Sequence, residues 1–432
     1  MNKIIKDFYK KSPYDYLVEY INRLDNNEVN KQVSIIKLHF GDFSEYKRSQ
    51  NRLLYTSQES LINLPSQEYD LLTEAKNIAN YVMKHAYEGD IVSWIIPYNS
   101  EKNVWSLTPL KEDLYNGISG LYLFFTYLYQ ETGEEKYNEF SNKILEQCYV
   151  GLSTNKQFGL SGFPSFFYAF SLINDYGDNN LKINKSINEY CKFFEQTLNE
   201  GLAKELEIDY VNGITVLINA LLRFYKKRKD IKFIELAIGF TNELEKRIDF
   251  LDMKPGYAHG ALGYALTFFR MGKETNIQRY IEKAQDLINF EDSKFKEISE
   301  NLSWCNGIIG EGIARLEIDE TIKSSDNNLI LTNITEQISN SSLLFNDCMC
   351  HGNMAITEFF LGHYLKTGNN DSYVISKKIA QNLIEFRYEN GQYKLMEIKE
   401  YPDVSLFTGI TGIGYQLLRL NNPQKVPAIL NI

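Results

Sequence analysis

The chain has little proline, little cysteine and no surplus of positive charge. Its 9 prolines among 432 residues amount to about 2%, against roughly 5% in an average protein, and this scarcity favours a mostly helical chain. The 46 Lys and Arg residues are outnumbered by 56 Asp and Glu, which gives a formal net charge of −10. A protein that binds nucleic acid by neutralising phosphates usually carries a basic face. We therefore expect no nucleic-acid partner.

Long apolar runs are also missing. No stretch approaches the roughly 18 uninterrupted apolar residues of a membrane-spanning helix. The first residues, MNKIIKDFYKKSPYDYL, contain no apolar core of signal-peptide length. We expect a cytoplasmic protein that does not span a membrane and that meets a membrane surface only peripherally, through partners.

The 5 cysteines are too few for a disulfide framework, and their number is odd. They are Cys148, Cys191, Cys305, Cys348 and Cys350. In a reducing compartment, clustered cysteines indicate metal binding or catalysis more often than disulfides. The first two lie in amphipathic segments and are expected to be structural, which leaves the last three for chemistry.

Glycine is present in ordinary number but not in ordinary places. Of the 26 glycines, 15 fall in or beside seven similar segments, whose leading glycines are 42 to 57 residues apart. The segments are NGISGLYLFF from Asn116, FGLSGFPSFF from Phe158, NGITVLINAL from Asn212, HGALGYALTFF from His259, NGIIGEGIARL from Asn306, HGNMAITEFFL from His351 and TGITGIGYQLL from Thr408. Each opens an apolar run of about three helical turns.

Amphipathic segments separate these runs, so each repeat is expected to hold one outer, half-solvated helix and one inner, apolar helix. HEAT-type solenoids have a similar period. A closed ring, however, explains why every inner helix would begin with glycine, because glycines three residues apart let converging helices approach closely. The sequence therefore predicts an all-α fold, an α/α toroid of seven inner and seven outer helices with glycine-rich inner-helix N-termini.

Two parts of the chain lie outside this pattern. Residues 1–68 precede the first helix pair and are expected to form an N-terminal cap packed on a toroid domain of residues 69–432. Minor extended inserts are expected at 92–109 and at 387–398, where the sequence Glu-Asn-Gly-Gln is typical of a hairpin turn.

The repeat register predicts which reactive side chains meet. Equivalent positions of a ring lie at the same end, and consecutive repeats are neighbours. The two positions before the leading glycine hold His259, Cys305 and Cys350-His351 in three consecutive repeats. We expect these side chains to converge at one pole. There Cys305, Cys350 and His351 would provide the three protein ligands of a catalytic zinc site, which keeps its fourth position open.

Two further residues compete for roles at this pole. Cys348 is a rival zinc ligand, ranked below Cys350 because it lies outside the register. Asp209, four residues before Gly213, is a functional group, a helix cap or a solvated turn residue. If His259 or Asp209 supplied a fourth ligand, the zinc site would be closed and structural.

Several motifs occur together at these positions. They are the repeated Gly-x-x-Gly, Trp304-Cys305-Asn306-Gly307, Cys350-His351-Gly352, Gly256-Tyr257-Ala258-His259-Gly260 and Asp209-Tyr210-Val211-Asn212-Gly213. With them, from about residue 110 to 420, the chain resembles the lanthionine synthetase C-like cyclases, which install thioether rings in lanthipeptides.

This resemblance implies an α/α toroid, a zinc ion bound by Cys305, Cys350 and His351, and acid–base roles for His259 and Asp209. Relatives often have Tyr after the first zinc-ligand cysteine, and some have Arg shortly before it. This chain has Asn there and no Arg at 299–303, so roles tied to those two positions are not carried over.

The resemblance also implies a reaction and partners. Zinc would deprotonate a peptide thiol, whose free pKa is about 8.5, and the thiolate would add to dehydroalanine or dehydrobutyrine. His259 would then protonate the α-carbon, while Asp209 orients it or accepts the thiol proton. Expected partners are a dehydrated precursor peptide with its leader, a lanthipeptide dehydratase and an ABC transporter.

Two alternatives remain open at this point. One is another zinc–thiolate alkylation enzyme of the prenyltransferase type, which would use Asp209 in place of one cysteine. The other is a non-catalytic, zinc-containing scaffold that binds peptides. An open zinc position favours an enzyme, and four protein ligands favour the scaffold.

Overall fold

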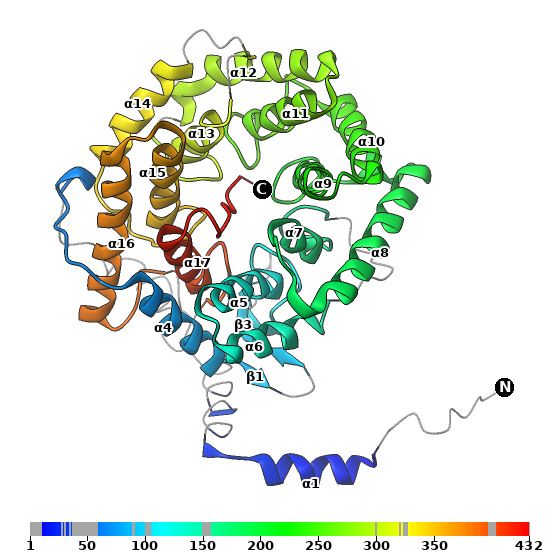
Figure 1. The fold of residues 1–432 in the computed structure, drawn as a ribbon, viewed down its shortest axis with the longest axis vertical. Coiled ribbons are helices and arrows are strands. Elements are labelled where there is room, and N and C mark those ends of the chain that lie inside the picture. Colours follow the sequence, from blue (N-terminus) through cyan, green and yellow to red (C-terminus); the bar gives the residue numbers. More distant parts are fainter. Residues whose placement is uncertain are drawn as a thin grey trace.

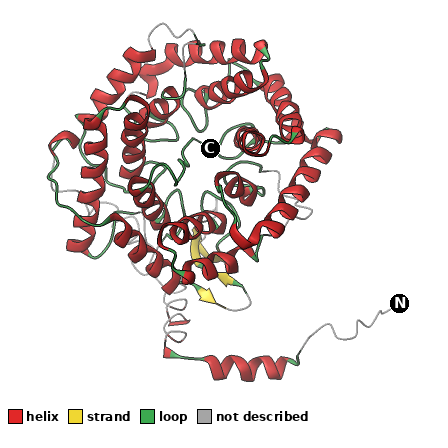
Figure 2. Ribbon diagram, in the orientation of Figure 1, coloured by secondary structure: helices red, strands yellow, loops and turns green. Residues whose placement is uncertain are grey.

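The computed structural model of the chain is mostly helical (Figure 2). It describes residues 11–26, 29, 32–33, 36, 59–88, 91–99, 105–148, 157–298, 300–318, 321–322, 327–395 and 403–431. Over these residues it contains 15 α-helices, with a few short 3-10 helices and strands. Within the same ranges, no helix is both long and apolar enough to cross a lipid bilayer.

The helices alternate between the inner and outer layers of a closed ring (Figure 1). The inner helices are α5 (Ile118–Thr132), α7 (Ser165–Leu172), α9 (Ile214–Arg228), α11 (Ala261–Thr275), α13 (Ile308–Arg315), α15 (Asn353–Thr367) and α17 (Ile410–Asn421). The outer helices are α4 (Leu71–Lys84), α6 (Glu135–Leu145), α8 (Asn180–Asn199), α10 (Ile231–Arg247), α12 (Gln278–Ile298), α14 (Asn327–Ser339) and α16 (Asn370–Asn390). The last helix, α17, packs against both α4 and α5 and closes the ring. The predicted α/α toroid with seven helices in each layer is confirmed.

Burial differs between the layers as the sequence pattern predicts. Every residue of α7 is buried, and so are 11 of the 15 residues of α11. The outer helix α8 instead buries one stripe that includes Ile183, Ile187, Tyr190 and Phe194. This spacing of three and four residues is that of an amphipathic helix packed on a core.

The start of each inner helix is fixed by a recurring hydrogen bond. In six repeats, the backbone N–H of the first helical residue donates to the carbonyl seven positions earlier. The pairs are Ile118 with Lys111, Ile214 with Glu207, Ala261 with Lys254, Ile308 with Asn301, Asn353 with Asn346 and Ile410 with Asp403. The glycine before each of these six helices leaves room for this loop to fold back over the helix N-terminus. At Gly307, for example, a Cβ would overlap the Asn301 carbonyl oxygen, which accepts the Ile308 N–H.

Backbone hydrogen bonds join these seven loops into a second, smaller ring at one end of the toroid. The links run from Leu114 to Leu160, Ser161 to Val211, Tyr210 to Ala258, Ala258 to Cys305, Trp304 to Cys350, Cys350 to Phe407 and Phe407 to Tyr115, donor first. We call this end the loop pole. Residues that share a place in the repeat are therefore neighbours at the loop pole, as the register predicts.

Repeat two follows a different register from the expected one. Leu160 accepts hydrogen bonds from Leu114 and Tyr115 of repeat one, so Gly162 takes the place that the leading glycines have elsewhere. The expected leading glycine, Gly159, lies three residues too early. Gly159 and Gly162 are three residues apart, as paired glycines are in several other segments, so the sequence alone does not show which of them leads the repeat. Hydrogen bonds to the neighbouring loops show that it is Gly162.

Of the two expected extended inserts, the first alone forms strands over the residues that the structure describes. The strand β1 (Tyr87–Glu88) pairs with β2 (Val92–Ser93), and β3 (Ile95–Asn99) pairs antiparallel with β4 (Trp105–Pro109). The second prediction is wrong over the described part of 387–398. There α16 continues to Asn390, and Gly391 ends it with φ 79° and an N–H that donates to the Arg387 carbonyl at 2.8 Å. A helix C-cap and a hairpin turn both need glycine in the left-handed region, which explains the error.

The N-terminal segment combines a separate helix with a short contact on the ring. The helix α1 (Pro13–Arg23) begins with a capping box at Ser12 and lies apart from the ring (Figure 1). The 3-10 helix η1 (Leu61–Asn63) packs on the outer layer, where the Leu61 N–H donates to the Ser341 carbonyl and Lys378 donates to the Ile62 carbonyl. Most residues between these elements lie outside the described ranges, and the boundary at residue 68 stays a prediction.

The segment after α17 turns into the middle of the ring (Figure 1). Leu430 is fully buried, and its carbonyl accepts a hydrogen bond from Nε1 of Trp304 at 2.7 Å. The guanidinium groups of Arg223 and Arg270 donate to the Asn431 carbonyl at 3.0 and 2.9 Å. The chain thus occupies the centre of its own ring, behind the loop that carries Cys305.

Candidate active site

Cys305 and Cys350 come together at the loop pole. They precede the neighbouring inner helices α13 and α15, and the Trp304 N–H donates to the Cys350 carbonyl at 2.9 Å. The two thiols affect each other's pKa. The interaction with Cys350 lowers the pKa of Cys305 to about 6, whereas the interaction with Cys305 and burial raise the pKa of Cys350. Cys305 is therefore the more acidic thiol of the pair.

Tyr115 approaches the pair from repeat one. Its hydroxyl donates to Sγ of Cys350 at 2.8 Å, and its ring stacks on Phe407 with 4.8 Å between centroids. Burial and the neighbouring Cys350 raise the pKa of Tyr115, so the hydroxyl keeps its proton. Tyr115 occupies the same place in the repeat as the two cysteines, two residues before the leading glycine, and donates a hydrogen bond to one of them.

His351 follows Cys350 in the same loop and is half-buried. Burial lowers the pKa of its imidazole, which favours the neutral ring that metals bind. Its Nε2 lies 3.4 Å from Nδ2 of Asn346. In the described ranges, no group of three His, Cys, Asp or Glu side chains is close enough to hold a metal ion. The structure brings the two thiols together, and the three-residue ligand set stays a prediction.

Cys348 occupies a capping position of the repeat. It is fully buried four residues before the leading glycine, and its Sγ accepts the His351 backbone N–H at 3.5 Å. In other repeats the same position holds Asp113, Asp209 and Ser303, which accept the equivalent N–H at 2.6, 2.5 and 3.3 Å. This shared role supports ranking Cys348 below Cys350 as a zinc ligand.

His259 and Asp209 form a hydrogen-bonded pair across adjacent repeats. Nδ1 of His259 lies 2.9 Å from Oδ2 of Asp209, while Oδ1 of Asp209 accepts the Asn212 backbone N–H. The two side chains keep 35% and 21% of their exposure, so the pair faces solvent. The bond to Asp209 raises the pKa of His259 against the opposing effect of burial, and negative charge at Cys305 adds to the rise. Asp209 is thus both a cap and a partner of His259.

Aromatic rings pack in a continuous row across the linked loops. The centroid distances are 5.0 Å for Tyr210–Tyr257, 5.7 Å for Tyr257–Trp304, 5.3 Å for Trp304–Phe407 and 4.8 Å for Phe407–Tyr115. Each of these rings comes from one of the linked loops. Ring contacts therefore join the loops that carry Asp209, His259, Cys305 and Tyr115.

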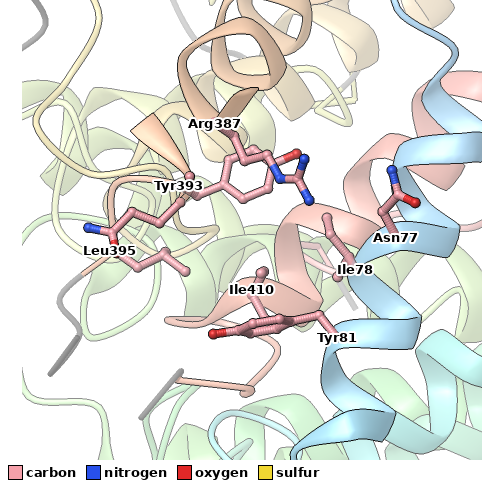
Figure 3. A pocket seen from close by; sticks show the side chains of 9 residues that line it. Asn77, Ile78, Tyr81, Arg387, Tyr393, Leu395 and Ile410 are labelled. Atoms are coloured by element: carbon pink, nitrogen blue, oxygen red, sulfur yellow. The ribbon is translucent and has the colours of Figure 1, made fainter. Parts of the chain in front are cut away.

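A pocket opens at the loop pole between α4, α16 and α17 (Figure 3). Together with the open space at its mouth it measures about 420 Å³, and it is lined by Asn77, Ile78, Tyr81, Arg387, Gly391, Gln392, Tyr393, Leu395 and Ile410. Its wall is tied to the cysteine loop, because the Asp347 N–H donates to the Lys394 carbonyl at 2.7 Å and the Lys394 N–H donates to Asp347 at 2.8 Å. Asp347 directly precedes Cys348. The pocket combines apolar walls with a guanidinium group one repeat away from Cys350.

Residues 108–431 match the model of the family described as lanthionine synthetase C-like protein. The chain belongs to this family. This lanthionine synthetase C-like chain is also similar to the lacticin 481/lactococcin biosynthesis protein LcnDR2 of Lactococcus lactis subsp. lactis, at 24% identity over 457 residues. That match covers 94% of this chain and 46% of LcnDR2, so the chain spans about half the length of this curated relative.

A solved structure shows that the fold of this lanthionine synthetase C-like chain is shared. The structure of nisin cyclase matches with a TM-score of 0.54 and 14% sequence identity, over 83% of this chain and 96% of that one. At this level of identity, the likeness supports the toroid and says nothing of individual side chains.

Three residues of the site were not singled out from the sequence. Tyr115 contacts Cys350, the Ser303 hydroxyl lies 3.7 Å from Sγ of Cys305, and Asn346 lies beside the imidazole of His351. Each has a fixed place in the repeat, at two, four and six residues before a leading glycine. Extending the register comparison from two positions to six would have found Ser303 and Asn346. Tyr115 lies within the two positions compared, but tyrosine there does not by itself indicate a contact with a thiol.

Proposed function

We propose that this chain is a zinc-dependent lanthipeptide cyclase. It adds peptide cysteine thiolates to dehydroalanine or dehydrobutyrine and forms lanthionine or methyllanthionine thioether rings. The observation that carries this proposal is the placing of the Cys305–Cys350 thiol pair beside the His259–Asp209 pair on linked loops. Family membership supports it, as does the name of LcnDR2, which assigns that relative to lacticin 481 and lactococcin biosynthesis.

The side chains at the loop pole have the donor chemistry that zinc prefers. Cys305 and Cys350 would supply two thiolates and His351 a neutral imidazole nitrogen, a set that suits a borderline-soft cation. Zinc bound there would lower the pKa of a substrate thiol that joined these ligands from its free value of about 8.5. Both oxygens of Asp209 are already engaged. This favours the Cys-Cys-His set over an Asp-Cys-His set of the prenyltransferase type and over a closed four-ligand site.

The proton step falls to His259. When the substrate sulfur bonds to the β-carbon, the π electrons move to the α-carbon, which must take up one proton. No atom leaves and nothing is oxidised, so the thiol hydrogen is in effect transferred to carbon. Asp209 holds Nδ1 of His259 and leaves Nε2 to carry that proton. Because Asp209 raises the pKa of His259, more of the imidazolium form is present near neutral pH to act as a general acid.

The pocket between α4, α16 and α17 is suited to a neighbouring residue of the same peptide. Ile78, Leu395 and Ile410 would contact an apolar side chain, and Arg387 would contact a peptide carbonyl beside it. A lanthipeptide dehydratase would supply the dehydrated residues, and an ABC transporter would export the product from the cytoplasm. The net charge of −10 would steer cationic peptides toward the surface.

The direct test is loss of peptide thiols. A dehydrated precursor peptide is incubated with the zinc-loaded protein, and its remaining thiols are alkylated and counted by mass spectrometry. Thiols should disappear with time, and Cys350→Ala should lose zinc and activity together. Cys191→Ala, a buried cysteine of the outer helix α8, is the matched control and should keep both. A protein with one bound zinc that consumed no thiols from several dehydrated peptides would overturn the proposal.

A further inference from the structure

A buried carboxyl group reaches the loop of His259 from the outer layer. Glu291 on α12 has no exposed surface, and its Oε1 accepts the backbone N–H of Gly256 at 2.7 Å. Gly256 lies three residues before His259 and has φ 105°, a conformation that only glycine adopts without strain. The turn at Gly256 is therefore set by its backbone and held from behind by Glu291.

The same turn also contacts the cysteine loop. A Cβ on Gly256 would lie 3.4 Å from Cα of Asn306, and the Ala258 N–H donates to the Cys305 carbonyl at 3.0 Å. The segment that ends in His259 thus has one anchor in the outer layer and one on the Cys305 loop. A shift of the outer anchor would move the imidazole relative to the sulfur of Cys305.

Glu291 is backed by a second buried carboxyl group. Glu311 on α13 has no exposed surface and pairs with the guanidinium of Arg315, which also pairs with Asp292. Burial, together with the adjacent Glu311, raises the pKa of Glu291 well above its usual value. Two carboxyl groups in contact inside a protein cannot both be charged at low cost. In the described part of the chain, Oε2 of Glu291 and Oε2 of Glu311 are both buried without a hydrogen-bond partner. A proton on Oε2 of Glu291 would face Glu311, while Oε1 accepts from Gly256.

We propose that Glu291 is a positioning residue for the cyclase reaction, which holds the Gly256 turn so that His259 stays in place beside Cys305. The inference rests on the proposed function in one respect, that His259 delivers the proton. The proposal requires a particular set of hydrogen-bonding groups at position 291. Glutamine has the same pattern as protonated glutamate, with one carbonyl oxygen to accept from Gly256 and an amide N–H to donate to Glu311. Aspartate keeps the carboxyl group but is one methylene too short to reach Gly256.

The test compares Glu291→Gln with Glu291→Asp in the full-length, zinc-loaded protein. We expect kcat of Glu291→Gln to stay within about threefold of wild type, and kcat of Glu291→Asp to fall about 10- to 100-fold, the cost of misplacing a reacting group by about 1 Å. KM and zinc content should not change in either variant. A role based on charge predicts the opposite order, with Asp the better substitute. That order, or equal kcat in both variants, would overturn the proposal.

A second readout separates this inference from the proposed function. The titration of His259 is followed by NMR in both variants, without any peptide. Glu291→Gln should leave the His259 titration unchanged, and Glu291→Asp should shift it because the imidazole moves relative to Asp209 and Cys305. If the wild-type protein consumes no thiols but the titrations differ in this way, cyclase function fails and the positioning role stands. If both variants titrate like wild type, the positioning role is refuted whatever the protein catalyses.

Discussion

The substitution Asp209→Asn distinguishes the two roles of Asp209, the cap on the Asn212 N–H and the charged partner of His259. Asparagine keeps an oxygen that can cap the Asn212 N–H at the present 2.5 Å, but it removes the charged oxygen 2.9 Å from Nδ1 of His259. Without that charge, the pKa of His259 falls toward its ordinary value of 6.5. Less imidazolium is then available near neutral pH, and the ring loses the partner that orients it.

The size of the effect follows from this geometry. A positioned acid or base contributes about 10²- to 10⁴-fold in rate, and we expect Asp209→Asn to lower kcat about 100-fold. The cost in stability is no more than about 1 kcal/mol, because both side chains are partly exposed and the bond is screened by solvent. A histidine pKa that is raised in the folded state stabilises the fold below the unfolded pKa, and this gain is lost as pH rises through the folded value. The stability difference from wild type should therefore be largest below about pH 6.5.

The chain supplies a matched control in repeat one. Asp113 caps the Asn116 N–H at 2.6 Å from the equivalent position, and among the described residues no histidine pairs with it. Asp113→Asn should leave kcat within about threefold of wild type. Thiol loss from a dehydrated peptide is measured for both variants across the pH range, with zinc content determined in parallel. Equal losses of rate would mean that capping alone matters, and loss of zinc from Asp209→Asn would make Asp209 a ligand. Either result refutes the reasoning.

Three further predictions concern other parts of the pole. Cys348→Ala should keep zinc and turnover while lowering the free energy of unfolding by about 1 kcal/mol in urea titrations, the usual cost of a lost cap. Gln392→Trp should fill part of the pocket and raise KM for the peptide about tenfold with kcat unchanged, whereas Gln196→Trp on the exposed face of α8 should change neither. Glu291 has a pKa raised above 4.5, so it stabilises the fold at low pH and this gain is lost as pH rises through the folded value. Chemical denaturation at several pH values should show a flatter stability profile for Glu291→Gln, and identical profiles would contradict the buried, protonated state.

The toroid was predictable because it repeats. Fifteen glycines and the apolar runs after them define a period, and the period alone indicates two helical layers and one shared pole. Where the pattern is locally ambiguous, the prediction failed. Two glycines at 159 and 162 fit repeat two equally well, and the sequence at 389–392 fits both a hairpin turn and a helix C-cap. Contacts with neighbouring loops decide these cases, and one sequence does not contain them.

The site, like the fold, was predictable only in part from the sequence. The meeting of Cys305 with Cys350 and of His259 with Asp209 follows from register, since hydrogen bonds between loops keep equivalent positions side by side. Glu291 could not be found like this. It lies in a charged, amphipathic segment and resembles a solvent-facing residue of an outer helix. Its burial depends on Glu311, one repeat further on, and on the bend at Gly256.

The central claim is that the thiol hydrogen of a peptide cysteine is replaced by a carbon–sulfur bond while a solvent-derived proton is delivered to the α-carbon. Cyclisation in D₂O, followed by return of the product to H₂O, tests this directly by mass spectrometry. We predict one retained deuteron for every thiol that the wild-type protein consumes, no change of mass when the reaction runs in H₂O, and neither thiol loss nor deuterium with Cys350→Ala. Thiols consumed without retained deuterium, or a gain of mass in H₂O from a transferred group, would contradict the claim.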